Sequence, residues 1–284
     1  MNKTVFFCVV FLSFVSKAQA LTLFFHGQPR QGELLFGYVS PQAVLTLNDE
    51  TITPRADGWF VVGIGRDDTD DLRFVAETEE EKLQKTLKII PREWKVQAVN
   101  GLPQNTVTPN EAEQKRIERE FALTAKARAT PVDDELPLCF ALPVKGRISS
   151  VYGSQRILNG IPKSPHNALD IANKTGTVIK APADGIVLLS YDEMLLSGKT
   201  LLLGHGQNLT TSYIHMDKIF VEKGQKVKKG DQLGTMGMTG RATGPHLHWT
   251  VMWKNKRVDP QVFLKNSENF CGRVSLKKKE GEQP

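Results

Sequence analysis

The feature that most constrains this chain is a pair of histidines one residue apart, placed after a turn rich in glycine and proline in segment 241–251 (RATGPHLHWTV). Side chains two residues apart on a β-strand point to the same face. His246 and His248 are therefore expected to share one small volume, while Leu247 and Trp249 face the opposite side, toward a core. Two imidazoles held together are unfavourable unless a metal ion or an anion binds them, so this segment predicts the start of a metal site.

A second candidate is the pair His166 and Asp170, four residues apart. This spacing could place both side chains on one face of a helix. Pro162 and Pro165 precede the pair and Gly176 follows it, which favours a loop that leads into a strand. With the histidine on the loop and the aspartate on the strand, both can reach one ion. Two histidines and one carboxylate, with a fourth position for water, are typical of a catalytic zinc site rather than a closed structural one.

His215 is the third candidate, at the end of segment 212–215 (SYIH). On a strand, Thr211, Tyr213 and His215 share one face, so His215 is expected to point into the same cleft. His205 lies in a turn, in segment 203–206, and is interpreted as structural. Any one of these histidines alone is more often structural than functional. The HxxxD pair, the strand histidine and the HxH pair together form a specific pattern.

These residues resemble the lysostaphin/LytM-type zinc endopeptidases, the β-lytic metallopeptidase family. The motifs that match are His166 with Asp170, segment 213–216 (YIHM) and segment 243–249 (TGPHLHW), with support from segments 143–150, 181–185 and 227–231. The resemblance spans about residues 141–264. The family usually has Gly where Ala168 stands and Phe where Trp249 stands, and neither change touches a metal atom.

The resemblance implies that zinc is held by His166, Asp170 and His248, with His215 and His246 beside it without being permanent ligands. It implies an antiparallel β-sheet groove as the fold and peptide cross-links of peptidoglycan as the substrate. Zinc lowers the pKa of a bound water from about 15.7 towards 7. One of the two assisting histidines moves the proton to the leaving amine, and the other hydrogen-bonds the developing oxyanion. The sequence does not assign these two roles between His215 and His246.

Two other functions are compatible with the same domain. The first is a non-catalytic regulator that has lost metal residues and activates other cell-wall hydrolases. The second is a general extracellular protease that uses the same chemistry. All five site residues are present, which argues against the regulator, and a panel of substrates separates the protease from a cell-wall enzyme.

The N-terminal segment is predicted to direct export. Residues 1–20 combine Lys3, an apolar run at 5–15 and small residues at 18–20, as in a signal peptide; an uncleaved membrane anchor is the alternative. The mature protein would be periplasmic or extracellular, without stable membrane insertion. Loss of Lys3 and Lys17 leaves 35 basic and 31 acidic residues, a net charge of +4. Such a protein suits the anionic polymers of the envelope, and its charge does not argue for nucleic acid.

Two cysteines, Cys139 and Cys271, remain after removal of the signal peptide. In an oxidising compartment they suggest one disulfide, with two buried free thiols as the alternative. The oligomeric state does not follow from the sequence.

Residues 21–100 are predicted to form a small β-sandwich-like module. Strands are expected at 33–39, 43–47, 59–62, 72–77 and 86–90, with turns at 48–50 and 57–58. The charged stretch 79–82 is expected to join the last two strands as a hairpin, and a helix is the alternative. The module contains no catalytic constellation, and His26 is interpreted as a residue without a functional role.

Residues 101–137 are predicted to be a helix and a linker. Thr108, Pro109 and Glu111 suggest an N-cap, a first helical position and a capping box. Residues 116–128 are charged, with a narrow apolar stripe of Ile117, Phe121 and Ala125 that could lie on a neighbouring domain. Segment 130–137 is the linker, short enough to hold the upstream region near the groove. This region is expected to restrain access to the groove, or else to bind the cell wall or a partner.

Residues 138–271 are predicted to be the peptidase domain and residues 272–284 a basic polar tail. Short strands punctuated by glycine are expected at 147–152, 169–172, 185–191, 200–203, 209–215 and 246–253. No long helical periodicity appears between Pro143 and Pro260. The fold class is therefore mainly β, with an antiparallel β-sheet groove.

Overall fold

The computed structural model of the chain describes residues 20–101 and 108–272. The predicted signal peptide lies outside these residues except for Ala20, and the basic tail except for Gly272. No helix among the described residues is long and apolar enough to cross a lipid bilayer.

The module upstream of the connecting helix consists of short strands. They are β1 (Leu23–His26), β2 (Leu34–Val39), β3 (Val44–Leu47), β4 (Glu50–Ile52), β5 (Trp59–Gly63), β6 (Leu72–Glu77), β7 (Lys82–Leu87) and β8 (Val96–Val99). One sheet has the order β1-β2-β5 and the other β4-β3-β6-β7. Phe25 and Phe60 from the first sheet pack on Phe74 of the second, with ring centroids 4.5 and 6.2 Å away. The two sheets therefore form a small sandwich.

The predicted hairpin around the charged stretch is present, and the helical alternative is wrong. Strands β6 and β7 pair from Leu72 opposite Leu87 to Glu77 opposite Lys82. The second strand begins four residues earlier than predicted, because the turn occupies residues 78–81 and closes with a hydrogen bond from the Thr78 N–H to the Glu81 carbonyl. Most side chains of β7 are exposed and polar, so no apolar alternation marks its limits in the sequence.

The second half of the chain is built on one large antiparallel sheet. Its main path has the order β17-β14-β15-β16-β19-β12-β9, with β13, β18 and β20 paired at its side. The strands of this sheet are β9 (Arg147–Ser150), β12 (Leu169–Ala172), β13 (Val178–Lys180), β14 (Gly185–Met194), β15 (Gly198–Gly204), β16 (Leu209–Ile219), β17 (Lys226–Val227), β18 (Gln232–Met236), β19 (His246–Trp253) and β20 (Lys256–Val258). A separate sheet has the order β11-β10-β8, with β10 at Ser154–Leu158 and β11 at Ile161–His166. The predicted fold class, mainly antiparallel β, is confirmed.

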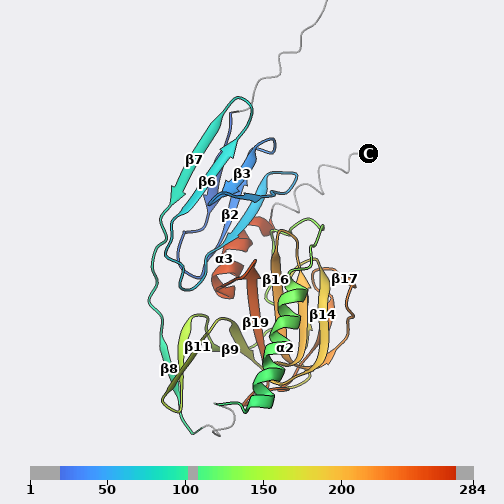
Figure 1. Cartoon of the computed structure of the whole chain (residues 1–284). Coiled ribbons are helices and arrows are strands. Elements are labelled where there is room, and N and C mark those ends of the chain that lie inside the picture. Colours follow the sequence, from blue (N-terminus) through green and yellow to red (C-terminus); the bar gives the residue numbers. More distant parts are fainter. Residues whose placement is uncertain (1–19, 102–107, 273–284) are drawn as a thin grey trace, which may run out of the picture.

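The N-cap of the connecting helix α2 (Glu111–Arg128) lies two residues after the predicted one. The cap is Asn110, whose side chain accepts from the Glu113 N–H, while the Glu113 carboxylate accepts from the Asn110 N–H, both at 2.9 Å. The buried face contains Ile117 and Ala127. Phe121, placed in the apolar stripe by the sequence, is 57% exposed. The helix lies across the open face of the large sheet, over β14 and β15 (Figure 1).

The sandwich and the large sheet share one hydrophobic core. Helix α3 (Pro260–Cys271) lies between them, and its Phe263 and Phe270 pack on Phe36 of β2, with ring centroids 6.3 and 4.8 Å away (Figure 1). Strand β8 also pairs in parallel with β10. The sequence boundaries predicted at residues 100 and 137 therefore separate segments that pack together in three dimensions.

A disulfide joins Cys139 to Cys271, as predicted. The bond links a residue just before the strands of the large sheet to the last residue of α3, across a sequence separation of 132 residues.

The double variant Cys139→Ser/Cys271→Ser should unfold at a lower denaturant concentration, with a loss in the free energy of unfolding of about 4–5 kcal/mol on the loop-entropy model. Urea unfolding measures this loss. Two reactive thiols in the unreduced, unfolded wild-type protein, or an unchanged unfolding midpoint, would contradict the expectation.

Candidate metal centre and groove

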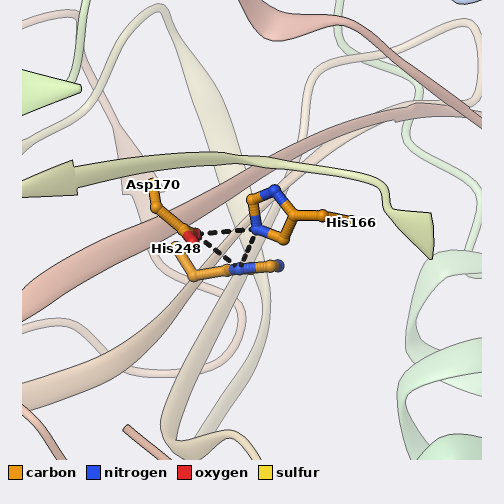
Figure 2. Close-up of side chains that lie close together, drawn as sticks. All are labelled: His166, Asp170 and His248. Atoms are coloured by element: carbon orange, nitrogen blue, oxygen red, sulfur yellow. Dashed lines mark hydrogen bonds and ion pairs between the residues drawn. The ribbon is translucent and has the colours of Figure 1, made fainter. Parts of the chain in front are cut away.

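Three strands bring His166, Asp170 and His248 to one point (Figure 2). Asp170 on β12 lies directly opposite His248 on β19 in the antiparallel register. The Asp170 Oδ1 atom lies 2.8 Å from His248 Nδ1 and 3.0 Å from His166 Nε2, and the two histidine nitrogens are 3.2 Å apart. Asp170 is on a strand as predicted, whereas His166 is the last residue of β11 rather than a loop residue.

The donor set of this cluster suits a zinc ion. The Nδ1 atom of His166 lies 3.0 Å from the Val151 carbonyl, which can only accept, so this nitrogen carries the proton. In the neutral ring, Nε2 then directs a lone pair at the Asp170 carboxylate, an arrangement that a bound cation stabilises. Two ligands of a tetrahedral zinc ion with bonds of 2.0–2.1 Å stand about 3.3 Å apart, close to the separations in the cluster.

The surroundings of the cluster favour an ionised Asp170 and a neutral His248. Burial alone would raise the pKa of Asp170, but the interactions with His166 and His248 outweigh it and hold this pKa well below its usual range. Burial lowers the pKa of His248, against the opposing effect of Asp170. An ionised carboxylate beside neutral histidines is the protonation state in which all three residues can bind a metal.

A second pair, His215 and His246, lies beside this cluster. Their ring centroids are 4.7 Å apart, and the ring of His215 is 6.1 Å from that of His248. The Nδ1 atoms of the pair lie 2.8 and 2.9 Å from the carbonyls of Thr239 and Gly244. In its neutral form each ring therefore donates through Nδ1 and keeps Nε2 to accept a proton. Burial lowers the pKa of His215 to about 4, so this side chain is neutral at pH 7.

His215 enters the site by a route that strand alternation does not predict. Tyr213 pairs with Trp249 in the register, and both side chains are fully buried on the core face. Regular alternation would place His215 on that face too, so the predicted common face of Tyr213 and His215 is wrong. His215 instead has a φ of 62°, where β16 bulges against β15, and the bulge turns its ring toward the groove.

Neighbouring loops hold this bulge in place. The His215 N–H donates to the Ser197 carbonyl at 2.9 Å, while its ring is fixed by Thr239. Gly198 allows these loops to approach, because a Cβ atom on it would lie 2.2 Å from the Thr239 hydroxyl oxygen. Left-handed backbone at a residue other than glycine costs about 1–3 kcal/mol and is concentrated at functional sites.

His205 does not join the site. It is 1% exposed, and its ring bridges the Asp184 carbonyl at 2.7 Å and the Thr211 hydroxyl at 2.8 Å. Burial lowers its pKa to about 4. The structural role inferred from the sequence agrees with these contacts. The two departures from the family pattern, Ala168 and Trp249, are both fully buried and away from the groove.

The cluster opens into a cavity of about 650 Å³ between the large sheet and helix α2. The helix contributes one wall with Ile117, Phe121 and Arg128, among others. The sequence indicated that this helix could cover a neighbouring surface but did not indicate that it lines the groove. Four arginines of the cavity, Arg128, Arg156, Arg241 and Arg257, were also missed, because no motif connects residues so far apart in the chain.

The chain matches known proteins along most of its length. Residues 164–260 match the model of Peptidase family M23. A solved structure described as a peptidase M23 from Pseudomonas aeruginosa is 30% identical with a TM-score of 0.64, over 84% of this chain and 96% of that one.

Two curated relatives match over a shorter part. The peptidoglycan DD-endopeptidase ShyA of Vibrio cholerae is 38% identical over 117 residues, which are 40% of this chain and 27% of ShyA. The murein hydrolase activator NlpD of Escherichia coli is 29% identical over 122 residues, 43% of this chain and 30% of NlpD. The chain thus spans less than a third of the length of either. The family resemblance predicted from the motifs is confirmed, and since the Pseudomonas protein is matched over nearly its whole length, the chain belongs to peptidase family M23.

Proposed function

We propose that the protein is an exported zinc-dependent endopeptidase that hydrolyses peptide cross-links of peptidoglycan. The observation that carries the proposal is the convergence of His166, Asp170 and His248 beside the pair His215 and His246, at the end of a groove. The likeness to ShyA supports the substrate class.

In this proposal His166 Nε2, Asp170 Oδ1 and His248 Nδ1 hold the zinc ion. Zinc supplies Lewis acidity toward the scissile carbonyl and lowers the pKa of water. The protein contributes a fixed ligand set: the Val151 carbonyl orients His166, and the strand register orients Asp170 and His248. Arg156, 3.5 Å from the other Asp170 oxygen, balances part of the carboxylate charge.

His215 and His246 move the proton. Each presents Nε2 to the groove as an acceptor, because its Nδ1 is engaged by a backbone carbonyl. One ring accepts the proton of the attacking water and returns it to the leaving amine. The other ring, after it takes up a proton from solvent at Nε2, donates a hydrogen bond to the carbonyl oxygen as negative charge develops there. The centroids of the two rings are 4.7 Å apart, so both rings can reach the same peptide bond.

The activator is the second candidate, since NlpD carries that name. An activator needs no intact metal centre, and all five polar residues stand in one place here, which favours an enzyme. A general extracellular protease would share this chemistry and would cut glycine-rich proteins as fast as muropeptides. In the proposal the protein acts in the periplasm or outside the cell, on wall peptides and not on nucleic acid.

The metal assignment predicts the behaviour of two ligand variants. The purified wild-type protein should retain one zinc ion per chain after dialysis. Asp170→Ala and His248→Ala should each lose most of it, since each removes one of three protein ligands. His26→Ala, a change far from the groove at the edge of the sandwich, is the matched control and should retain the metal. Elemental analysis measures the ratio, and full occupancy in both ligand variants would refute the assignment.

The catalytic assignment predicts a different pattern. His215→Ala and His246→Ala should keep zinc but cleave cross-linked muropeptides more slowly by about 10²–10⁴-fold, the usual contribution of a positioned acid or base. Mass spectrometry of the products measures the rate. Wild-type protein that leaves muropeptides intact and accelerates a second hydrolase would establish the activator instead. Equal cleavage of a glycine-rich protein would establish the general protease.

A further inference from the structure

The floor of the groove runs from the metal cluster to an arginine on β20. Strand β19 directs His248, Thr250 and Met252 into the cavity, as alternate residues of one strand face. Arg257 pairs with Met252 in the register of β19 and β20. Met252 lies four residues after His248 on the strand, which at about 3.3 Å per residue corresponds to a distance of roughly 13 Å.

Helix α2 runs along the same length of groove. Ile117, near its start, lines a small pocket together with Leu196 and Gly240. The residues next to these two in the chain, Ser197 and Thr239, bond His215 beside the metal cluster. Arg128, eleven residues later, lines the main cavity together with Arg257. Eleven helical residues span about 16 Å. The helix wall and the strand floor therefore both end in an arginine at the end of the groove away from His248.

The two arginines lack an acidic partner. Among residues 20–101 and 108–272, no carboxylate forms an ion pair with Arg128 or with Arg257. Among the described residues, the carboxylate that lines the cavity is that of Glu120. Glu120 accepts from Arg116 Nε at 2.8 Å and from the Leu195 N–H at 2.9 Å, while Asp170 belongs to the metal cluster. This end of the groove therefore carries uncompensated positive charge.

The environment makes this pair of cations unfavourable without an anion. Burial, and then the charge of Arg257, lower the pKa of Arg128 to about 10. Burial also lowers the pKa of Arg257. A carboxylate between the two groups would remove their repulsion and accept hydrogen bonds from both planar guanidinium groups.

We propose that Arg128 and Arg257 form a carboxylate-binding subsite, which takes an acidic residue of a bound peptide several residues from the bond at the His166–Asp170–His248 cluster. This proposal rests on the proposed endopeptidase function and names the feature of the substrate that the groove selects. A peptide fits the site better than a small free anion, because the subsite lies in line with the metal cluster along an extended strand. The helix supplies one of the two arginines, so it acts as a wall that contributes to specificity.

The test compares two synthetic stem tetrapeptides of peptidoglycan, one with its D-glutamate carboxylate free and one with that carboxylate as an amide. Calorimetric titration of the full chain gives a Kd for each. The wild type should bind the free acid about 10-fold to 100-fold more tightly, since charge-assisted hydrogen bonds are lost on amidation. Arg128→Gln and Arg257→Gln should each reduce this ratio to near one and leave the Kd of the amide unchanged.

Arg119→Gln is the matched control, because it removes an exposed arginine from the same helix outside the groove. It should retain the wild-type ratio. Equal Kd values for the two peptides in the wild type, or the same loss of the ratio in the Arg119 variant, overturn the subsite. Cleavage of cross-linked muropeptides is scored separately. Cleavage without a Kd ratio overturns the subsite alone, whereas a Kd ratio without cleavage supports the subsite and overturns the endopeptidase.

Discussion

The backbone register between β12 and β19 determines where the candidate metal centre forms. It places Asp170 opposite His248 on the groove face and Leu169 opposite Trp249 on the core face. A slip of one residue would exchange the two faces, placing the carboxylate in the apolar core and the indole on the groove face. Burying large apolar side chains such as Leu169 and Trp249 is worth about 1.5–3 kcal/mol each. Packing in the core therefore enforces the position of the polar residues on the other side.

The same sheet also shows where a regular strand is insufficient. His215 follows Tyr213 at a spacing that belongs to the core face, and only the positive φ at His215 brings its ring to the groove. The cost of this backbone conformation is offset by hydrogen bonds from His215 to Ser197 and Thr239. The metal cluster thus follows from regular pairing, whereas the neighbouring histidine pair depends on a local irregularity.

This difference explains what could be predicted from the sequence. The HxH and HxxxD spacings, with two-residue strand periodicity, indicated a site of two histidines and a carboxylate and the core positions of Leu247 and Trp249. The family resemblance then selected His166, Asp170 and His248 as the ligands. The bulge could not be predicted, because it depends on contacts with loops distant in sequence. The start of the helix was missed by two residues, since Thr108 and Asn110 are both good N-caps. The short strands β10, β11 and β20 carry little apolar alternation and were not predicted.

The shared core gives the connecting helix its place in the groove. Residue Leu136 is fully buried, and its carbonyl accepts from Arg55 of the sandwich. Phe36 of the sandwich packs on Phe263 and Phe270 of α3, and the disulfide ties the end of α3 back to Cys139. Removing the upstream segment would expose this apolar surface as well as open the groove, so a change in activity after truncation would mix the two effects. Because Arg128 comes from the helix and Arg257 from the sheet, the groove has its full set of charges only when both parts of the chain are present.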